Sequence, residues 1–426
     1  MADHLEVECL FVGGGPAGTG PLVYAAASGQ LDELLKDGIA LVEGSSTLCV
    51  GRLSKYTIRS NSAASSFIEC LEHPHSGRVF AQSIGSSAYK SLSQARWDTV
   101  DLPLVAEMLR SIGSDLERAL TRSGNAQVFT DSQVRSIRVL GECDYLAAVS
   151  TPQGVRHIRA RQLVLAPGGE PVRDSSLQAL VAEHVRAARG AVEFVNSETL
   201  LAGQHMDELR KLLAGPASNV VIFGGSHSAF SSASVLEPLA NEIHILHRDR
   251  LKVFYPSESA ARADGYTHFD TNDVCAETGR VFRIAGLRGH ARELYRRIAS
   301  GDCGHIRLAQ VKTNEDLLNF RWGETNLVVF ALGYSFKQIE ILNEAGMPLV
   351  LDGDTSGQYV DSKSRLLGRD GRPIPGMYAI GMATGFKPTG KLGGEPSFNG
   401  RDNSVWLCQH LLGQMIWEQL CARELA

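Results

Sequence analysis

The stretch "VECLFVGGGPAGTGPLVYAAASG", from Val7 to Gly29, decides the fold of this 426-residue chain. Residues 5–12 alternate and then become apolar, which predicts a buried strand. Residues 19–28 have the small and apolar side chains of a helix packed closely on a sheet, and "GIALVEG", Gly38 to Gly44, predicts the next buried strand. A strand, a glycine turn, a helix and a second strand in this order begin a doubly wound α/β sheet.

The glycine turn itself predicts a dinucleotide phosphate site. Gly13 makes the turn, Gly15 lets the backbone approach a pyrophosphate, and Gly18 lets helix and strand pack closely. The free N–H groups at the start of the helix and its positive dipole end then face the phosphates. Glu43 ends the second strand, where its carboxylate is placed to accept hydrogen bonds from a ribose 2′-OH.

A second glycine turn repeats this design in "NVVIFGGSHSAFSSASVLEPLA", which begins at Asn219. The pattern predicts a strand over 219–224, a helix over 229–239 and a strand over 242–248. Serine and alanine replace two glycines, but their hydroxyl and backbone N–H groups still suit phosphate oxygens. The predicted phosphate-binding residues are Gly224, Gly225, Ser226, His227 and Ser228.

The strand that follows this second turn ends in "HRDR", His247 to Arg250, where an NAD-specific protein usually has an acid. A guanidinium there accommodates a 2′-phosphate, so the sequence predicts NADPH, with Arg248 as the first candidate and Arg250 as the second. The alternative is that both arginines form a solvated strand end.

Composition and cysteine spacing limit the other classes of partner. The net charge of −5 gives no basic footprint, so nucleic acid is not an expected partner. We expect no membrane span and no signal peptide, because no run of about 18 apolar residues occurs and no basic segment precedes an apolar one. The eight cysteines show no C-x-x-C or zinc-finger spacing, which predicts reduced thiols in a cytoplasmic protein, no metal site and no dithiol for disulphide reduction. The sequence is compatible with a homo-oligomer and leaves this state open.

Further patterns complete the predicted organisation. The patterns predict a helix over 102–122, short strands over 127–150 and 155–160, buried strands over 162–169, 326–334 and 376–385, and a final helix over 403–421. "DGDTSGQY" and "GRDGRPIPG" read as turn-rich hairpin loops. The simplest arrangement is one dinucleotide-binding domain made of residues 1–172 and 344–426, with a second such domain, 173–343, inserted into it.

The Gly-x-Gly-Pro-Ala-Gly form of the first turn resembles the FAD-binding end of two-dinucleotide-binding flavoproteins. Three later segments resemble the same family: "LVLAPGG" from Leu163, "GMYAIGMATG" from Gly376 and "GGEPSFNGRDNSVWLCQHLLG" from Gly393. The resemblance implies an FAD/NAD(P)-binding Rossmann-like doubly wound fold, with FAD at the first turn and NADPH at the second. Met382 departs from the pattern, since most members have an aspartate there that bonds the ribityl hydroxyls.

The resemblance and the turn chemistry together give a set of cofactor-binding candidates. Besides the second-turn residues and His247, Arg248 and Arg250, this set comprises Gly13, Gly15, Pro16, Ala17, Gly18, Glu43, Gly44, Arg52, Ser60, Asn61, Val134, Ala166, Gly168, Ala331, Gly333, Tyr334, Gly381, Met382, Ser397 and Phe398. Met382 is included only as a neighbour of the flavin. For Val134, a plain core position is an equally good interpretation.

Two segments narrow the resemblance to class B flavin monooxygenases. "FALGYS", from Phe330, resembles the "ATGY" segment of this class, above all of the siderophore N-hydroxylases. "RSNSAASSF", from Arg59, falls where flavin-containing monooxygenases carry Asn-Thr-Ser near the flavin, which makes Asn61 the candidate catalytic residue; a helix-capping role with Ser62 stays open. Gly18 stands where the N-hydroxylases usually have asparagine, and the Baeyer–Villiger fingerprint is absent.

The resemblance implies an FAD- and NADPH-dependent monooxygenase that uses a C4a-(hydro)peroxyflavin and O₂ to oxygenate a small substrate, foremost by N-hydroxylation of an amine or amino-acid-like compound. Two alternatives remain: an NADPH-dependent flavoprotein reductase that passes electrons to a protein or quinone, and a non-catalytic flavoprotein scaffold. Four histidines are expected to be satisfied surface or loop residues rather than bases: His227, His268, His290 and His305. The segment 265–298 is expected either to hold a charged substrate or to cover the sheet as a helix.

Overall fold

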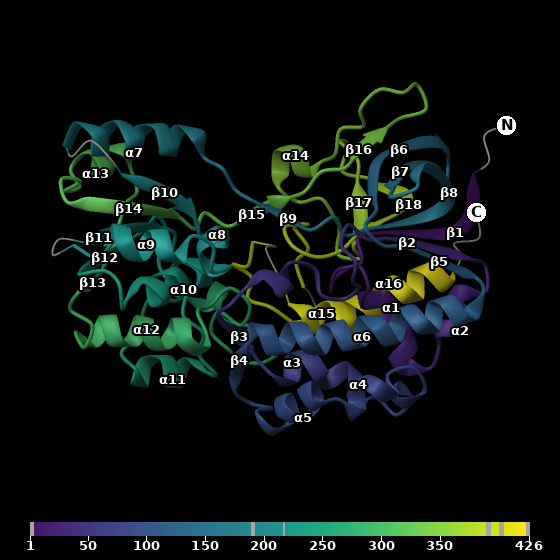
Figure 1. The fold of residues 1–426 in the computed structure, drawn as a ribbon, viewed down its shortest axis with the longest axis horizontal. Helices are drawn as coiled ribbons and strands as arrows, with labels where there is room; N and C mark the ends of the chain where they lie inside the picture. Colours follow the sequence, from purple (N-terminus) through teal and green to yellow (C-terminus); the bar gives the residue numbers. More distant parts are fainter. Residues whose placement is uncertain (1–3, 189–191, 216–217, 389–392, 400–403, 423–426) are drawn as a thin grey trace.

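The computed structural model describes residues 4–188, 192–215, 218–388, 393–399 and 404–422. Two lobes, each built on its own β-sheet, stand side by side (Figure 1). One sheet has nine strands and the other five, and helices pack against both. The predicted α/β architecture with two Rossmann-like units is confirmed.

The nine-stranded sheet forms the first lobe and has the order β16-β6-β7-β8-β1-β2-β5, with β17 and β18 joined to it beside β8. Its strands are β1 (Leu5–Val12), β2 (Ile39–Val42), β5 (Ala126–Phe129), β6 (Gln133–Gly141), β7 (Asp144–Thr151), β8 (Gly154–Leu165), β16 (Glu340–Leu342), β17 (Arg365–Leu367) and β18 (Pro373–Ala379). β1 pairs in parallel with both β2 and β8, as a doubly wound sheet requires. β8 is one continuous strand, whereas the sequence predicted two separate ones.

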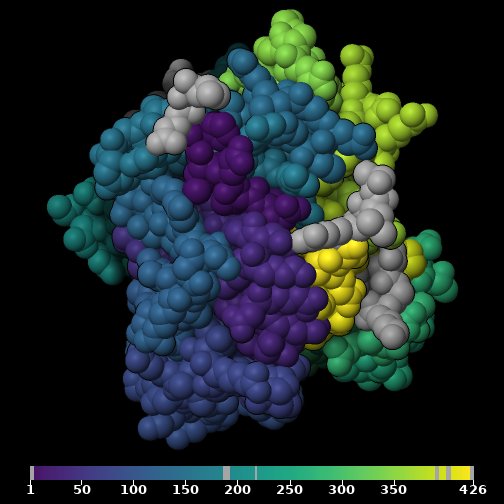
Figure 2. Space-filling view, turned by 90° about the vertical axis from the view of Figure 1, so that its right-hand side faces the viewer, coloured from purple at the N-terminus to yellow at the C-terminus, as the bar shows by residue number. Residues whose placement is uncertain are grey.

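The helices of the first lobe cover this sheet and extend below it (Figure 1). They are α1 (Gly20–Ser28), α2 (Leu31–Leu35), η1 (Gly51–Lys55), α3 (Ser65–Ile68), η2 (Glu69–Glu72), η3 (Ser76–Arg78), α4 (Ala81–Gly85), α5 (Ser87–Gln94), α6 (Leu102–Ser123), α14 (Gly353–Ser356), α15 (Val405–Gln409) and α16 (Leu411–Ala422). A small antiparallel pair, β3 (Arg59–Ala63) and β4 (Thr99–Asp101), faces the second lobe. The N-terminal and C-terminal segments lie side by side on one face (Figure 2), where α1 packs on α16.

The second lobe contains a purely parallel sheet of order β10-β14-β11-β12-β13. Its strands are β10 (Glu193–Asn196), β11 (Asn219–Phe223), β12 (Glu242–His247), β13 (Ile306–Gln310) and β14 (Thr325–Phe330). Its helices are α7 (Ser175–Ala188), α8 (Ser197–Leu201), α9 (Met206–Leu212), α10 (His227–Leu236), α11 (Glu258–Ala263), η4 (Thr271–Asp273), α12 (Gly289–Ser300) and α13 (Asn314–Leu318). Separate apolar clusters pack on the two faces of the sheet.

Two short antiparallel strands, β9 (Gly169–Pro171) and β15 (Tyr334–Phe336), lie where the chain passes between the lobes (Figure 1). The predicted division at residues 172/173 and 343/344 remains a proposal. β16 lies just before the second of these boundaries and already pairs with β6 of the first sheet.

Several other predicted elements differ in the structure, among them the strand predicted over 326–334, which ends at Phe330. The final helix is broken at His410, where the backbone leaves helical geometry (φ −119°, ψ −105°), and its predicted first residue, Asn403, lies outside the described residues. "DGDTSGQY" contains the helical turn α14 rather than a hairpin loop, while "GRDGRPIPG" does join the antiparallel pair β17 and β18. The strand predicted over 376–385 ends at Ala379.

Within the described ranges, no helix is long and apolar enough to cross a bilayer.

Candidate functional site

The first glycine turn has room for a side-chain atom at Gly15 but none at Gly13 or Gly18. A Cβ on Gly13 would lie 2.1 Å from the Ala166 carbonyl oxygen, and one on Gly18 would lie 1.9 Å from the Gly13 carbonyl oxygen. At Gly15 the nearest atom would be the Gly51 Cα at 3.7 Å, so the turn is open there. No described residue accepts a hydrogen bond from the N–H groups of Gly15, Ala17 or Gly18. Open space beside free N–H groups at a helix start fits a dinucleotide pyrophosphate.

Glu43 closes this cradle from the end of β2. Its Oε2 accepts the Gly14 N–H at 2.6 Å, and its Oε1 accepts the N–H and hydroxyl of Ser45 at 2.9 and 2.7 Å. Each carboxylate oxygen accepts about two hydrogen bonds, so Oε2 keeps capacity for a ribose hydroxyl. The predicted ribose contact therefore fits this geometry, and it stays a prediction.

The second turn repeats the packing of the first. Gly224 has φ 139°, and a Cβ on it would lie 2.4 Å from the Ala331 carbonyl oxygen, as Gly13 (φ 101°) packs on Ala166. In both lobes the first glycine thus rests on the residue that follows a neighbouring parallel strand. Among the described residues no acceptor is found for the N–H groups of 225–228, which leaves the start of α10 free for phosphate.

A cavity of about 1210 Å³ connects the second turn with the flavin side of the first lobe. Its lining includes Gly224–Ser228 and Ala331–Tyr334 from the second lobe, and Asn61, Met382 and Phe398 from the first. Gly381, which precedes the lining residue Met382, packs against the first turn, since a Cβ added to it would meet the Ala17 Cβ at 2.8 Å. The second turn and the predicted flavin-side residues therefore line one cavity, and the first turn lies next to Met382 at its edge.

The cavity lining is strongly cationic although the chain as a whole is acidic. Eight arginine and lysine side chains line it against three carboxylates. A wall with this excess of positive charge concentrates anions, and phosphates above all.

The two predicted 2′-phosphate arginines differ in their surroundings. Arg248 lines the cavity with 81% of its side chain exposed and has only an exposed ion pair with Asp249 at 3.4 Å. Arg250 is bonded to the buried Asp273 at the base of the cavity wall. His247 directs Nδ1 to the Asp249 carbonyl at 2.8 Å. The geometry favours Arg248, and all three roles stay predictions.

His227 begins α10 instead of lying in a loop, and it faces the cavity. Burial and the nearby Arg288 charge lower its pKa to about 4, so the ring is neutral at physiological pH. Its Nε2 accepts the Arg288 N–H at 3.0 Å, which requires the proton to be on Nδ1. The Nδ1–H is therefore a donor beside the predicted pyrophosphate position.

Several other predicted residues make contacts that hold the two lobes together. Arg52 pairs with both carboxylate oxygens of Glu198 at 3.1 and 3.0 Å, and the hydroxyls of Tyr56 and Tyr334 lie 3.0 Å apart. Within the first lobe, by contrast, the buried Ser60 hydroxyl donates to the Ser62 carbonyl and accepts the Val100 N–H, so it joins β3 to β4. These contacts leave the cofactor roles of Arg52, Ser60 and Tyr334 as predictions.

The remaining cofactor-binding candidates are not among the residues that line the cavity. Ser397 donates its hydroxyl to Asp273 at 2.6 Å, and Val134 is a buried residue of β6, as its core interpretation requires. Outside the lining are also Gly13, Gly15, Pro16, Ala17, Gly18, Glu43, Gly44, Ala166, Gly168 and Gly381. Of the other histidines, His268 and His290 are exposed and His305 is half-buried.

The sequence patterns single out none of the cationic side chains that line the cavity from residues 252–292. Four of them are Lys252, Arg280, Arg283 and Arg288, and Trp97 lines the same cavity from the first lobe. Arginines at 280, 283, 288 and 292 recur at short intervals in the segment expected to hold a charged substrate. That spacing was the available signal, but it did not show which of these side chains reach the cavity.

Comparison with known proteins identifies the relatives of this chain. The pyridine nucleotide-disulphide oxidoreductase family matches residues 7–391. CMP-5′-(3-aminopropyl)phosphonate hydroxylase of Streptomyces rubellomurinus is 31% identical over 450 residues, covering 100% of this chain and 99% of that protein.

Two solved structures share the fold at low sequence identity. The ornithine N-hydroxylase of Kutzneria sp. 744, determined with reduced FAD, NADP⁺ and L-ornithine, has a TM-score of 0.55 at 17% identity over 98% of this chain and 100% of its own. The bacillithiol disulfide reductase of Staphylococcus aureus has a TM-score of 0.51 at 12% identity over 99% of both chains. These two likenesses show the fold alone, since it is shared by an oxygenating and a disulphide-reducing enzyme.

Proposed function

The chain belongs to the pyridine nucleotide-disulphide oxidoreductase family and is a flavin-dependent oxidoreductase that uses FAD and NADPH, and from this premise we propose that it hydroxylates the amine of a small anionic substrate. The observation that carries the proposal is the cavity lined by both the second glycine turn and the predicted flavin-side residues Asn61, Met382 and Phe398, whose walls bear an excess of positive charge. The full-length relative acts on an aminopropylphosphonate carried by CMP, and such a substrate matches a cationic cavity.

Cysteine placement separates this proposal from disulphide reduction, the activity in the family's name. None of the eight cysteines forms a disulphide, and none is among the residues that line the cavity. A reductase that passes electrons to a disulphide through its own dithiol needs a close cysteine pair at the flavin. Oxygenation needs no such pair.

When bound, FAD and NADPH supply hydride transfer and the activation of O₂. The balanced reaction converts the amine, O₂, NADPH and a proton into the hydroxylamine, water and NADP⁺. This chain's residues bind and orient the reactants: the two turns hold phosphates, and Asn61 offers an amide on the flavin side of the cavity. His227 donates from Nδ1 without adding charge.

The proposed activity is tested by measuring hydroxylamine product against NADPH consumed and hydrogen peroxide released. We expect one hydroxylamine per NADPH with CMP-5′-(3-aminopropyl)phosphonate, and little peroxide. NADPH oxidation that yields only peroxide, or that proceeds only with a quinone or protein acceptor, would support the reductase alternative. Failure to retain flavin after purification and reconstitution would support the scaffold alternative.

The choice of NADPH over NADH has its own test. Arg248→Ala should weaken NADPH binding about tenfold or more and leave NADH within about twofold, because a guanidinium–phosphate contact is worth at least ~1.4 kcal/mol. The affinities are measured by titration of the flavin-loaded enzyme, with Arg372→Ala, an exposed arginine outside the cavity, as control. Equal losses for the two coenzymes would show that Arg248 does not read the 2′-phosphate.

We also propose a cytoplasmic location, which the absence of a disulphide among the eight cysteines supports.

A further inference from the structure

A group of cations lines the cavity in addition to the predicted 2′-phosphate arginines. This cationic wall consists of Lys252, Arg280, Arg283 and Arg288, all from the segment that follows β12. Arg248 and Lys312, by contrast, directly follow β12 and β13 at the carboxyl edge of the parallel sheet, where a bound NADPH places its adenosine end. Arg248 and Lys312 thus supply two cations for a 2′-phosphate without any residue of the wall.

The backbone that carries the wall is held rigidly. The buried Glu395 accepts the N–H groups of Ile284 and Ala285 at 2.9 and 2.8 Å, which fastens the wall to the C-terminal part of the chain. Gly286 fits against the Phe254 backbone so closely that a Cβ would lie 2.5 Å from its nitrogen. Such support preorganises the charges before a ligand arrives.

Ring and sulfur contacts position three side chains of the wall. Arg288 lies over the Phe254 ring at 4.6 Å, and Lys252 lies over Phe282 at 5.7 Å. Arg283 donates to the buried Cys275 Sγ at 3.7 Å. Burial raises the pKa of Cys275, but hydrogen bonds from Thr278, Gly394 and Arg283 outweigh it and bring the pKa to about 7. The Arg280 guanidinium makes no hydrogen bond or ion pair with the described residues.

An aromatic surface of the first lobe lies next to the wall. Gly289, which follows Arg288, packs so closely on β4 that a Cβ would lie 2.6 Å from the Thr99 Cγ2, and Trp97 stands two residues before Thr99. Trp97 lines the cavity and is 78% exposed, with Arg96 over its ring at 5.2 Å. An indole left this open at a binding cavity offers a face on which a planar ring stacks.

We propose that the cationic wall and Trp97 form a substrate subsite for a nucleotide: the wall binds its phosphate or phosphonate oxygens and Trp97 stacks on its base. This subsite rests on the proposed function, since the nucleotide is the carrier of the amine that is hydroxylated. The occupant is a pyrimidine or purine monophosphate joined to an aminoalkyl chain, which reaches from the wall toward Asn61 on the flavin side.

Calorimetric binding of CMP to the FAD-loaded enzyme saturated with NADP⁺ tests the subsite without turnover. We expect Arg280→Gln and Trp97→Ala each to weaken CMP binding about tenfold, the loss of one charge-assisted or one stacking contact. Arg372→Gln, which removes an exposed charge elsewhere, should change it less than about twofold. Orthophosphate and cytidine as separate probes assign the wall and Trp97: Arg280→Gln should weaken the first, and Trp97→Ala the second.

Three outcomes would overturn the subsite: no binding of CMP to the wild-type enzyme, equal binding by all variants, or a loss of NADP⁺ affinity in Arg280→Gln as large as the loss for CMP. The last would assign the wall to the coenzyme. CMP binding that depends on Arg280 and Trp97 without any hydroxylamine product would uphold the subsite and reject the proposed reaction.

Discussion

At the scale of single residues, the glycines of the first turn have separable functions. Gly13 and Gly18 are required by packing, because a Cβ at either would run into a carbonyl oxygen. Gly15 is not, since its φ lies outside the left-handed region and its nearest neighbour would be 3.7 Å from a Cβ. The space at Gly15 therefore fits the predicted ligand contact, and the sequence pattern alone does not distinguish such a contact from a packing requirement.

Gly15→Ala should consequently fold normally but lose FAD. We expect the thermal unfolding of the flavin-free variant to match that of the flavin-free wild type, and FAD affinity to fall at least about tenfold. Gly13→Ala is the contrasting variant and should not yield folded protein, because it adds both a clash with Ala166 and an unfavourable positive φ. The measurements are the flavin-to-protein absorbance ratio and a fluorescence titration with FAD. Full flavin retention by Gly15→Ala would contradict the assigned cradle.

Protonation of His227 should lower the free energy of unfolding as the pH falls. Its folded-state pKa of about 4 lies below the ordinary value of 6.5, so the unfolded chain takes up the proton first as the pH falls. The native state should lose up to about 3 kcal/mol between about pH 6.5 and pH 4 from this group. His227→Gln keeps an acceptor for the Arg288 N–H and should flatten the dependence of unfolding free energy on pH over that range. Parallel curves for the two proteins, measured by urea denaturation, would show that His227 is not the group responsible.

At the scale of elements, the local sequence pattern is sufficient to predict the positions of strands and helices that bury one continuous face. β1, α1, α6, β11 and β12 all lie where the sequence placed them, because alternation, helical periodicity and glycine stops act within about ten residues. The break at His410 was not predicted, since it accompanies a close approach of Gly20 and Gly413 to the Cys408 carbonyl. That contact joins segments almost 400 residues apart in the sequence.

The same distinction applies to the site. The turn residues could be predicted because each motif is contiguous, whereas the cationic wall is fixed by Asp273 and Glu395, which receive hydrogen bonds from Ser397 and from Ile284 and Ala285. Each of these bonds spans more than 100 residues, so no local spacing reveals it.

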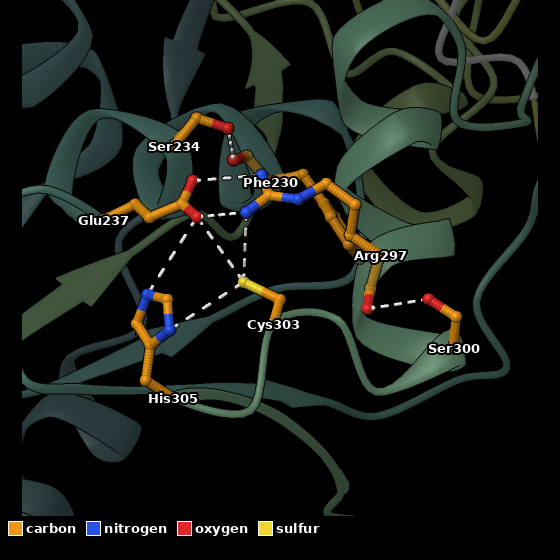
Figure 3. Close-up of polar contacts among 7 residues, drawn as sticks. All are labelled: Phe230, Ser234, Glu237, Arg297, Ser300, Cys303 and His305. Carbon is orange, nitrogen blue, oxygen red and sulfur yellow. Dashed lines mark hydrogen bonds and ion pairs between the residues drawn. The ribbon is translucent and has the colours of Figure 1, made fainter.

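A polar cluster joins the ends of three elements in the second lobe (Figure 3). Glu237 follows α10 and accepts Arg297 of α12 at 2.6 Å, while Cys303 and His305 approach it from the chain that leads into β13. The Glu237, Cys303 and His305 ligand atoms lie within 4.8 Å of one another, a spacing that suits a metal ion. The Arg297 guanidinium already bonds Glu237 and lies 3.5 Å from the Cys303 sulfur, so it supplies the positive charge in this group.

We therefore expect Glu237 to act as a structural tie and not as a metal ligand. The hydrogen bond from Arg297 is the main cause that lowers the pKa of Glu237, so its contribution is present at neutral pH and is lost as the pH falls through its folded-state pKa. Glu237→Gln should cost about 1–2 kcal/mol of unfolding free energy at pH 7, and Cys303→Ser, which leaves the ion pair intact, should cost less. Added Zn²⁺ should leave the melting temperature unchanged. A Zn²⁺-dependent rise that Glu237→Gln abolishes would identify a metal site instead.

At the scale of the whole molecule, the two lobes are joined by the crossing strands β9 and β15 and by contacts beside them (Figure 1). Arg52 reaches Glu198, Tyr56 reaches Tyr334, and the Thr57 N–H donates to the Leu201 carbonyl at 3.0 Å. These contacts all come from the η1–β3 part of the first lobe and join it to the second lobe. The charge of the molecule is distributed accordingly: cations face the cavity, while the chain as a whole carries a net charge of −5.

This distribution predicts that NADPH association depends steeply on ionic strength. A cationic cavity in an acidic protein attracts a polyanion mainly near the cavity mouth. Raising the salt concentration from about 20 to 300 mM shortens the screening length from roughly 20 to 6 Å. This change should slow NADPH association about tenfold and should alter NADPH dissociation much less. Stopped-flow quenching of flavin fluorescence gives both rates. The variant Arg248→Gln/Lys312→Gln removes two cavity charges and should reduce the salt dependence, whereas Arg372→Gln should not. An unchanged salt dependence in the double variant would show that Arg248 and Lys312 do not attract the coenzyme, and the overall charge of −5 could not replace them because it repels NADPH.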